Sequence, residues 1–246
     1  MASWVTVSTM RRILIGVVIL LGLLAVVDRI AVAVADRAVA KQIRSEMELR
    51  EDPSVHISGF PFLTQAVRGR YRDMHVRIPG VTSGELRNVD VDSRLHGVHA
   101  SLTDLSSGKL DGVPVDEITG SVLVRYDELA RASGIPGLTI RPVTGGLQVS
   151  GQVDVLGRHI TASALAHVTV RDDDLVVTAE NATIGGAAVP PAVVAAATRR
   201  LSFPVAQGQL PLALRITGVS TGADGLSVTA EAQHVVLRRG LLAGVE

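Results

Sequence analysis

The stretch Ile57-Ser58-Gly59-Phe60-Pro61-Phe62-Leu63-Thr64-Gln65, which continues as Ala66-Val67-Arg68-Gly69-Arg70-Tyr71-Arg72, is the most informative part of this chain. Residues 59–63 form an apolar wedge that contains two of the protein's six aromatic residues. A basic cluster follows at once, made of Arg68, Arg70, Arg72 and Arg77 and opposed by Asp73 alone. Apolar side chains beside fixed cations suit a molecule with an apolar body and an anionic head, such as a phospholipid.

The N-terminus carries a membrane-targeting segment. Arg11-Arg12 precede an uninterrupted apolar run, Ile13–Val27, that ends at Asp28-Arg29. As a helix the run is about 22 Å long, which is shorter than most membrane spans. Small residues at Ala33-Val34-Ala35 fit a signal-peptide cleavage site. Two interpretations stay open for residues 1–35, a signal peptide cleaved near Ala35 or an uncleaved N-terminal anchor, and both predict export to the periplasmic side of the cell envelope.

The composition narrows the class of protein. Residues 36–246 are long enough for one domain with a substantial core or for two small ones, and we expect a single lipid-binding domain. Acidic and basic residues are equal in number, 24 each, which argues against a nucleic-acid partner. The chain has no cysteine and so has neither disulfides nor thiolate metal sites. It also lacks a P-loop and a dinucleotide fingerprint, so we expect no cofactor.

The apolar spacing changes along the chain. Residues 28–51 predict a long amphipathic helix that stops at Asp52-Pro53. Its stripe consists of Val32, Ala35, Val39, Ile43 and Met47. Apolar and polar residues then alternate over 147–155, 160–170 and 226–233, as in antiparallel strands joined by short turns. We expect an α+β, β-rich fold in which a highly curved antiparallel sheet wraps the long helix, with short helices at 126–133 and 190–201.

The order of these features resembles the LmeA-like (lipomannan-elongation-factor-like) phospholipid-binding proteins of the actinobacterial envelope. The resemblance depends on Val55–Gln65, on Gly69-Arg70-Tyr71, and on Asn88–Val91 with Leu95–Val98. It extends over nearly the whole chain and implies a tubular lipid-binding fold, a half-barrel around a long helix. It also implies anionic phospholipid ligands, of which the phosphatidylinositol type is one, and a supporting role in the assembly of envelope glycolipids.

Eight residues are candidates for lipid contact. The apolar candidates suit a tip that enters a membrane or the mouth of a lipid tunnel, although Phe62 also suits a plug at the end of the sheet. The arginines suit a phosphate group, although each alone also suits a solvated strand face. The predicted lipid-binding set is Phe60, Phe62, Leu63, Arg68, Arg70, Tyr71, Arg72 and Arg77.

The sequence gives little support for catalysis or for metal binding. Gly218–Gly222 has the spelling of a nucleophile elbow around Ser220, but an alternating strand follows where that motif needs a helix, so we expect a hairpin turn there. His96 and His99 have weak metal spacing and no evident carboxylate partner. We therefore predict a non-enzymatic phospholipid-binding protein at a membrane surface. The alternative is a scaffolding protein that contacts another envelope protein and holds no lipid.

Overall fold

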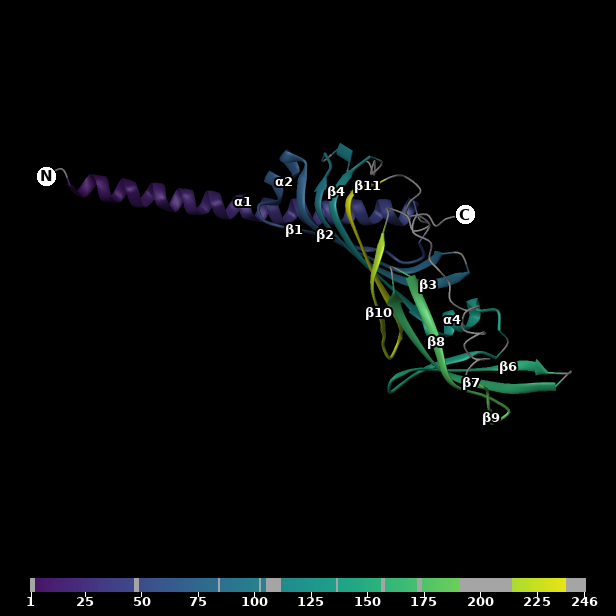
Figure 1. Ribbon diagram of the computed structural model, residues 1–246. Coiled ribbons are helices and arrows are strands. Elements are labelled where there is room, and N and C mark those ends of the chain that lie inside the picture. Colours follow the sequence, from purple (N-terminus) through teal and green to yellow (C-terminus); the bar gives the residue numbers. More distant parts are fainter. Residues whose placement is uncertain are drawn as a thin grey trace.

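A computed structural model describes residues 3–46, 49–83, 85–101, 103–104, 112–135, 137–155, 158–171, 174–190 and 214–237 (Figure 1). One long helix enters a curved sheet, and a second sheet lies beyond it. The helices are α1 (Ser3–Glu46), α2 (Phe62–Arg68) and α4 (Tyr126–Ala132). The strands are β1 (Ser54–Ser58), β2 (Arg70–Ser83), β3 (Leu86–His99), β4 (Pro114–Arg125), β5 (Thr139–Val143), β6 (Gly146–Val155), β7 (Arg158–Arg171), β8 (Asp174–Ile184), β9 (Ala187–Ala188), β10 (Arg215–Thr221) and β11 (Gly225–Val236).

Helix α1 joins the targeting segment and the predicted amphipathic helix into one continuous element of 44 residues. Its first half projects from the domain, and its second half lies along the curved sheet (Figure 1). The predicted stripe is confirmed where it is described, because Val32, Val39 and Ile43 are buried. Met47 lies outside the described residues. The helix ends at Glu46, earlier than the expected end at residue 51.

The first sheet has six antiparallel strands in the order β1-β2-β3-β4-β11-β10. It curves around the second half of α1, as the sequence predicted (Figure 1). Its core takes α1 residues together with the inward faces of β1 to β4, and Ile57, Tyr71, Val98 and Val115 are among the most buried members. The predicted β-rich α+β class is therefore confirmed, with a sheet that covers its helix without closing on itself.

The sequence led us to expect one curved sheet around the helix, and the structure corrects this expectation. Strands β5 to β9 form a separate five-stranded antiparallel sheet. The alternating segments 147–155 and 160–170 belong to it as β6 and β7, so they do not wrap α1. A small core of its own, with Tyr126, Leu147 and Ala166 buried, joins this sheet to the first near α4. Alternation predicted that these segments are strands, but it carries no information on which sheet they enter.

The helix expected at 126–133 is α4, which ends one residue earlier. The β10–β11 hairpin turns at residues 222–224, between Thr221 and Gly225. The helix expected at 190–201 falls almost entirely outside the described residues.

Candidate lipid-binding site

Residues 59–69 form a compact projection at the end of the domain from which α1 emerges, and we call it the α2 tip (Figure 1). Gly59 enters it with φ +104°, a conformation that L side chains rarely adopt. Phe60 and Pro61 are joined by a cis peptide bond, and α2 begins directly afterwards at Phe62. Gly69 ends the helix in the left-handed region, φ +63°, and its N–H group donates to the carbonyl of Ala66. The sequence of the wedge thus produces a short helix held between two glycines.

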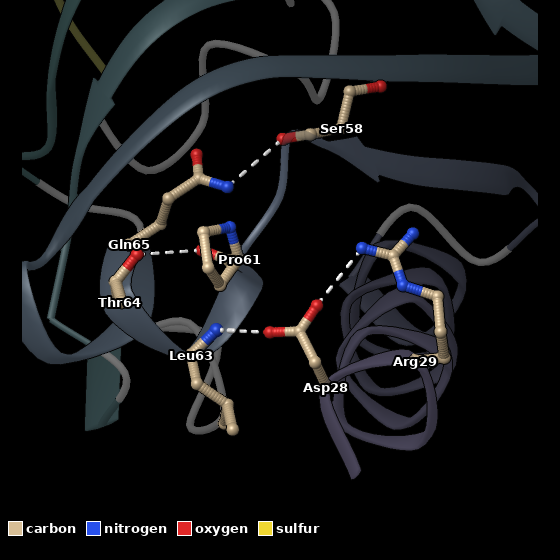
Figure 2. A network of polar contacts seen from close by, with 7 residues as sticks. All are labelled: Asp28, Arg29, Ser58, Pro61, Leu63, Thr64 and Gln65. Carbon is tan, nitrogen blue, oxygen red and sulfur yellow. Dashed lines mark hydrogen bonds and ion pairs between the residues drawn. The ribbon is translucent and has the colours of Figure 1, made fainter. Parts of the chain in front are cut away.

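Asp28 of α1 fastens the α2 tip to the long helix. Its Oδ1 atom accepts a hydrogen bond of 2.9 Å from the backbone N–H of Leu63, in the first turn of α2. Its Oδ2 atom accepts a bond of 3.0 Å from Arg29. Figure 2 shows the carboxylate lying between the two helices. Because Pro61 at the N-cap makes no side-chain cap bond, Asp28 supplies from another element the acceptor that a capping residue normally provides.

Gln65 braces the other side of the same loop. Its Nε2 atom donates to the carbonyl of Ser58 at 3.3 Å, and its Oε1 atom accepts from the N–H of Arg72 at 3.0 Å. Thr64 adds a bond from its hydroxyl to the carbonyl of Pro61, at 2.8 Å (Figure 2). The side chain of Gln65 is buried, so the amide links β1, α2 and β2 where solvent hardly competes.

The outer surface of the α2 tip is apolar and basic. Phe60 is 62% exposed, and the guanidinium of Arg29 lies over its ring at 5.3 Å from the centroid. Val67 is 89% exposed, and Leu63 is half-buried. Large apolar side chains this exposed within one short segment are typical of a surface that meets lipid or protein.

Two of the predicted contact residues lie inside the core instead. Phe62 is 2% exposed and Tyr71 is completely buried, and their rings pack with centroids 6.1 Å apart. The Tyr71 hydroxyl makes no hydrogen bond to any described residue. Burial raises the pKa of this hydroxyl, so it keeps its proton at neutral pH and remains a hydrogen-bond donor.

Three of the four predicted arginines gather at one end of the first sheet. Arg68 is the last residue of α2, whereas Arg70 and Arg72 open β2, and all three are exposed. An open hollow of about 450 Å³ lies here, lined by residues 66–69 of the α2 tip and by residues 99–101 at the end of β3. Arg68 lines the hollow itself, and Arg70 pairs across the strands with His99 on its wall.

Arg77 is separated from that group. It stands seven residues beyond Arg70 on the same strand, about 23 Å along an extended chain. Its guanidinium binds Asp92 of β3 at 2.9 Å, and His75 contacts the same carboxylate. Burial raises the pKa of Asp92, but the hydrogen bonds from His75 and Arg77 outweigh burial, so the pKa lies below its ordinary value. Arg77 is therefore part of an ion-paired group away from the hollow.

The sequence showed no evident carboxylate partner for His96 or His99, and the structure corrects this expectation. His96 binds Asp73 at 2.7 Å, and His99 binds Asp116 at 3.1 Å. The hydrogen bond from Asp73, together with its charge, raises the pKa of His96. These are single pairs across neighbouring strands, and the described residues include no group of three or more His, Asp or Glu side chains able to hold a metal ion.

Ser220 lies within strand β10, where it pairs with Ser227 of β11. The sequence predicted a hairpin turn at Gly218–Gly222, but β10 extends to Thr221 and the turn follows it at residues 222–224. A nucleophile elbow would place the serine between a strand and a helix, so the arrangement around Ser220 is that of a hairpin.

Sequence reasoning missed two acidic residues of α1. It treated Asp28 as the end of an apolar run and did not single out Asp36. In the structure Asp28 is 2% exposed, and Asp36 accepts the N–H of Ile57 at 2.9 Å. The available signal was that each aspartate stands next to buried positions of the stripe. The partner of Asp28 lies 35 residues away and that of Asp36 lies 21 residues away, so neither pairing could be read from the neighbouring sequence.

The model of the LmeA-like phospholipid-binding family matches residues 26–231, which cover most of the chain. The match contains the α2 tip, the second half of α1, the second sheet, and the first sheet as far as residue 231 in β11. No curated protein and no solved structure gives a match to this chain. The match confirms the resemblance inferred from the wedge and from the glycine-arginine-tyrosine motif that follows it: the chain belongs to the LmeA-like phospholipid-binding family.

Proposed function

We propose that this protein binds anionic phospholipid at the α2 tip, without catalysing a reaction, and supports lipid or glycolipid assembly on the periplasmic side of the cell envelope. The observation that carries the proposal is the hollow beside the tip, which is lined by exposed Val67 and Arg68, with exposed Arg70 and Arg72 following at the start of β2. An acyl chain would lie against Phe60, Leu63 and Val67. The phosphate would lie toward Arg68, close to Arg70 and Arg72 at the start of β2.

The energetics favour this division of roles. Each methylene shielded from water contributes about 0.8 kcal/mol, so acyl contact supplies most of the affinity. An arginine near an anionic surface contributes about 1 kcal/mol, and salt weakens that contribution. The arginines therefore select the head group more than they hold the lipid. Phosphatidylinositol-type lipids satisfy the same chemistry, because they carry one phosphate and a polar head.

The buried hydroxyl of Tyr71 supports a ligand that reaches beneath the tip. An unpaired buried donor costs about 1–3 kcal/mol. Tyr71 opens β2 between Arg70 and Arg72, and it packs against Phe62 under the tip. An ester or phosphate oxygen of a lipid would give this hydroxyl the acceptor that the described residues do not supply. In this arrangement Phe62 supports the tip from within.

A scaffolding role is the second candidate, and the second sheet favours it. Strands β5 to β9 lie far from α1 and from the α2 tip (Figure 1). Their small core leaves Val143 and Ile184 partly exposed, each at about 40%. A partner protein bound there would leave the tip free, and the purified protein would then contain no lipid.

The test compares two charge-reversal variants of the full chain, and for each it measures binding to vesicles and, separately, partition into a neutral detergent. The Arg70→Glu/Arg72→Glu variant should lose at least tenfold in binding to phosphatidylglycerol-containing vesicles, while its partition into a neutral detergent stays unchanged. The Arg141→Glu/Arg171→Glu variant carries the same charge change on exposed positions of the second sheet and should bind as the original protein does. Equal losses in both variants would show that only net charge matters. Equal losses in vesicles and detergent would show that the arginines do not select the head group.

Native mass spectrometry of the original protein separates lipid binding from scaffolding. A co-purified phospholipid supports the first, and a lipid-free protein supports the second. Prolonged incubation with that phospholipid should give no hydrolysis product, and a product lost on Ser220→Ala would show catalysis.

A further inference from the structure

We infer that α1 is retained as a transmembrane anchor and that it holds the α2 tip inside the outer part of the adjoining leaflet. The inference concerns where the protein sits, and it does not depend on the head-group selectivity proposed above. It decides between the two interpretations that the targeting segment leaves open, and it adds a membrane-contact surface to the domain.

The first argument is that residues before Ala35 belong to the folded domain. Asp28 is 2% exposed and Val32 is 8% exposed, and Val32 is part of the main core. Cleavage after Ala35 would remove both, together with the hydrogen bond that fastens Leu63. Residues 26–35 also lie inside the region that the family model matches. A cleavable leader would contribute nothing to the mature fold, whereas this segment caps one helix and fills part of the core.

The second argument concerns the length of the apolar surface. The run from residue 13 to residue 27 covers only about 22 Å, against a hydrocarbon core of about 30 Å. The structure shows the apolar surface continuing, because Ile30 and Val34 are about 60% exposed on the side of α1 that the domain leaves open. Residues 13–34 would span about 33 Å. Within α1, the stretch Leu14–Ser45 is long and apolar enough, by length and composition, to cross a membrane.

The third argument places the tip at the same depth as that surface. If the apolar boundary lies near Val34, then Asp28 lies about 9 Å deeper along the helix. That depth equals the 5–10 Å to which interfacial elements usually enter a leaflet. A bare carboxylate there would be costly, but the α2 tip covers Asp28, and Leu63 and Arg29 pair with it. The acidic residue that seemed to end the span is thus shielded by the domain.

The side chains on the outer surface of the tip fit this depth. Phe60 lies next to α1, since Arg29 stacks on its ring. An aromatic ring with a guanidinium above it is suited to the boundary between acyl chains and head groups, where the long arginine side chain reaches toward water. Arg68, Arg70 and Arg72 then lie near the phosphates. Arg11-Arg12 before the run place that end of the helix on the cytoplasmic side, so the domain lies outside.

The test uses the full chain in phosphatidylcholine vesicles that contain no anionic lipid. Because the chain has no cysteine, one introduced thiol can carry an environment-sensitive fluorophore at a chosen site. On Phe60→Cys, the label should be quenched at least threefold more by acyl-chain spin-labelled lipid than on Val143→Cys, a partly exposed position of the second sheet. If the Phe60 variant misfolds, Val67→Cys is measured in the same way. Equal quenching at the tip and at the control would overturn the insertion.

Retention has its own measurement. The full chain is produced in a bacterial host with the general secretion pathway, and the intact mass of the membrane fraction is determined after an alkaline carbonate wash. We expect a membrane-bound protein that still contains residues 1–35. A released protein that begins at residue 36 would overturn the anchor, whatever the vesicle-binding variants show about anionic lipid.

Discussion

The backbone N–H of Leu63 donates to the Oδ1 atom of Asp28 at 2.9 Å, across 35 residues of sequence. This bond connects the membrane-directed helix with the apolar tip, and Figure 2 shows it beside the Asp28–Arg29 pair. It gives one acidic side chain two roles, as a cap for α2 and as the point where the long helix α1 is joined to the α2 tip.

Replacing Asp28 with alanine should destabilise the protein by about 1.5–3 kcal/mol, because a hydrogen bond to a buried charged group is lost. The measurement is urea unfolding of the full chain in neutral detergent. Asp52→Ala is the matched control. Asp52 also pairs with an arginine, Arg44 at 2.6 Å, but both side chains are exposed, so its loss should cost at most about 1 kcal/mol. Equal effects of the two variants would contradict the role given to Asp28.

Replacing Gly59 with alanine should be more damaging than the same change at Gly134. Both glycines have positive φ, +104° and +66°, and both variants incur backbone strain of about 1–3 kcal/mol. At Gly59 the new Cβ atom would also lie 2.6 Å from Nε2 of Gln65, whereas at Gly134 no atom lies within 4 Å. The Gly59 variant should therefore unfold at a lower temperature and should bind lipid more weakly, since Gln65 must leave its bonds. Equal melting temperatures would show that Gln65 moves aside without cost.

Replacing Asp92 with asparagine should lower the free energy of unfolding more at neutral pH than at acid pH. The pKa of Asp92 is lowered in the fold, so its stabilisation is complete above the unfolded value of about 3.9 and is lost as pH falls through the folded value. The pair is partly exposed, so we expect a difference of about 1 kcal/mol at pH 6. Melting temperatures of both proteins between pH 6 and pH 3 provide the measurement. A difference that stays constant, or that grows below pH 4, would contradict this assignment.

Replacing Tyr71 with phenylalanine should separate stability from lipid binding. The variant keeps the ring that packs on Phe62 and removes a buried hydroxyl without a partner among the described residues. In detergent its stability should be equal to that of the original protein or up to about 2 kcal/mol higher. Its affinity for phospholipid should fall about fivefold or more, because one hydrogen bond to the ligand is lost. Unchanged affinity would show that no lipid oxygen reaches this hydroxyl.

Sequence patterns predicted much of the fold, because the patterns that matter here are local. The stripe through Val32, Val39 and Ile43 predicted the buried side of α1, and alternation over 160–170 predicted β7. The motif around Phe60-Pro61 predicted the family that the model match then showed. Arg68 and Arg70 were correctly grouped by their closeness in sequence, and they do lie at one end of the sheet.

The candidate site was only partly predictable, since its chemistry depends on pairing over long distances. Arg77 belonged to the same basic cluster in sequence, but Asp92, fifteen residues away on β3, takes up its charge. Phe62 and Tyr71 lie in the same motif as Phe60, yet they are buried and Phe60 is exposed. Their exposure is decided by the turn at Gly59 and by the packing of α2 on β2, and neither can be read from composition.

The sequence by itself determined that an apolar segment leads into an amphipathic helix, that strands follow, and that a glycine-phenylalanine-proline wedge precedes arginines. These features depend on helical and strand periodicity and on residue type, which act over a few neighbours. Only the tertiary structure decided that the strands divide into two sheets, that Arg77 is neutralised by Asp92, and that Asp28 closes onto Leu63. The physical reason is that each of these features joins residues far apart in the sequence, and the buried carboxylate of Asp28 in particular is stable only beside partners that the fold brings to it.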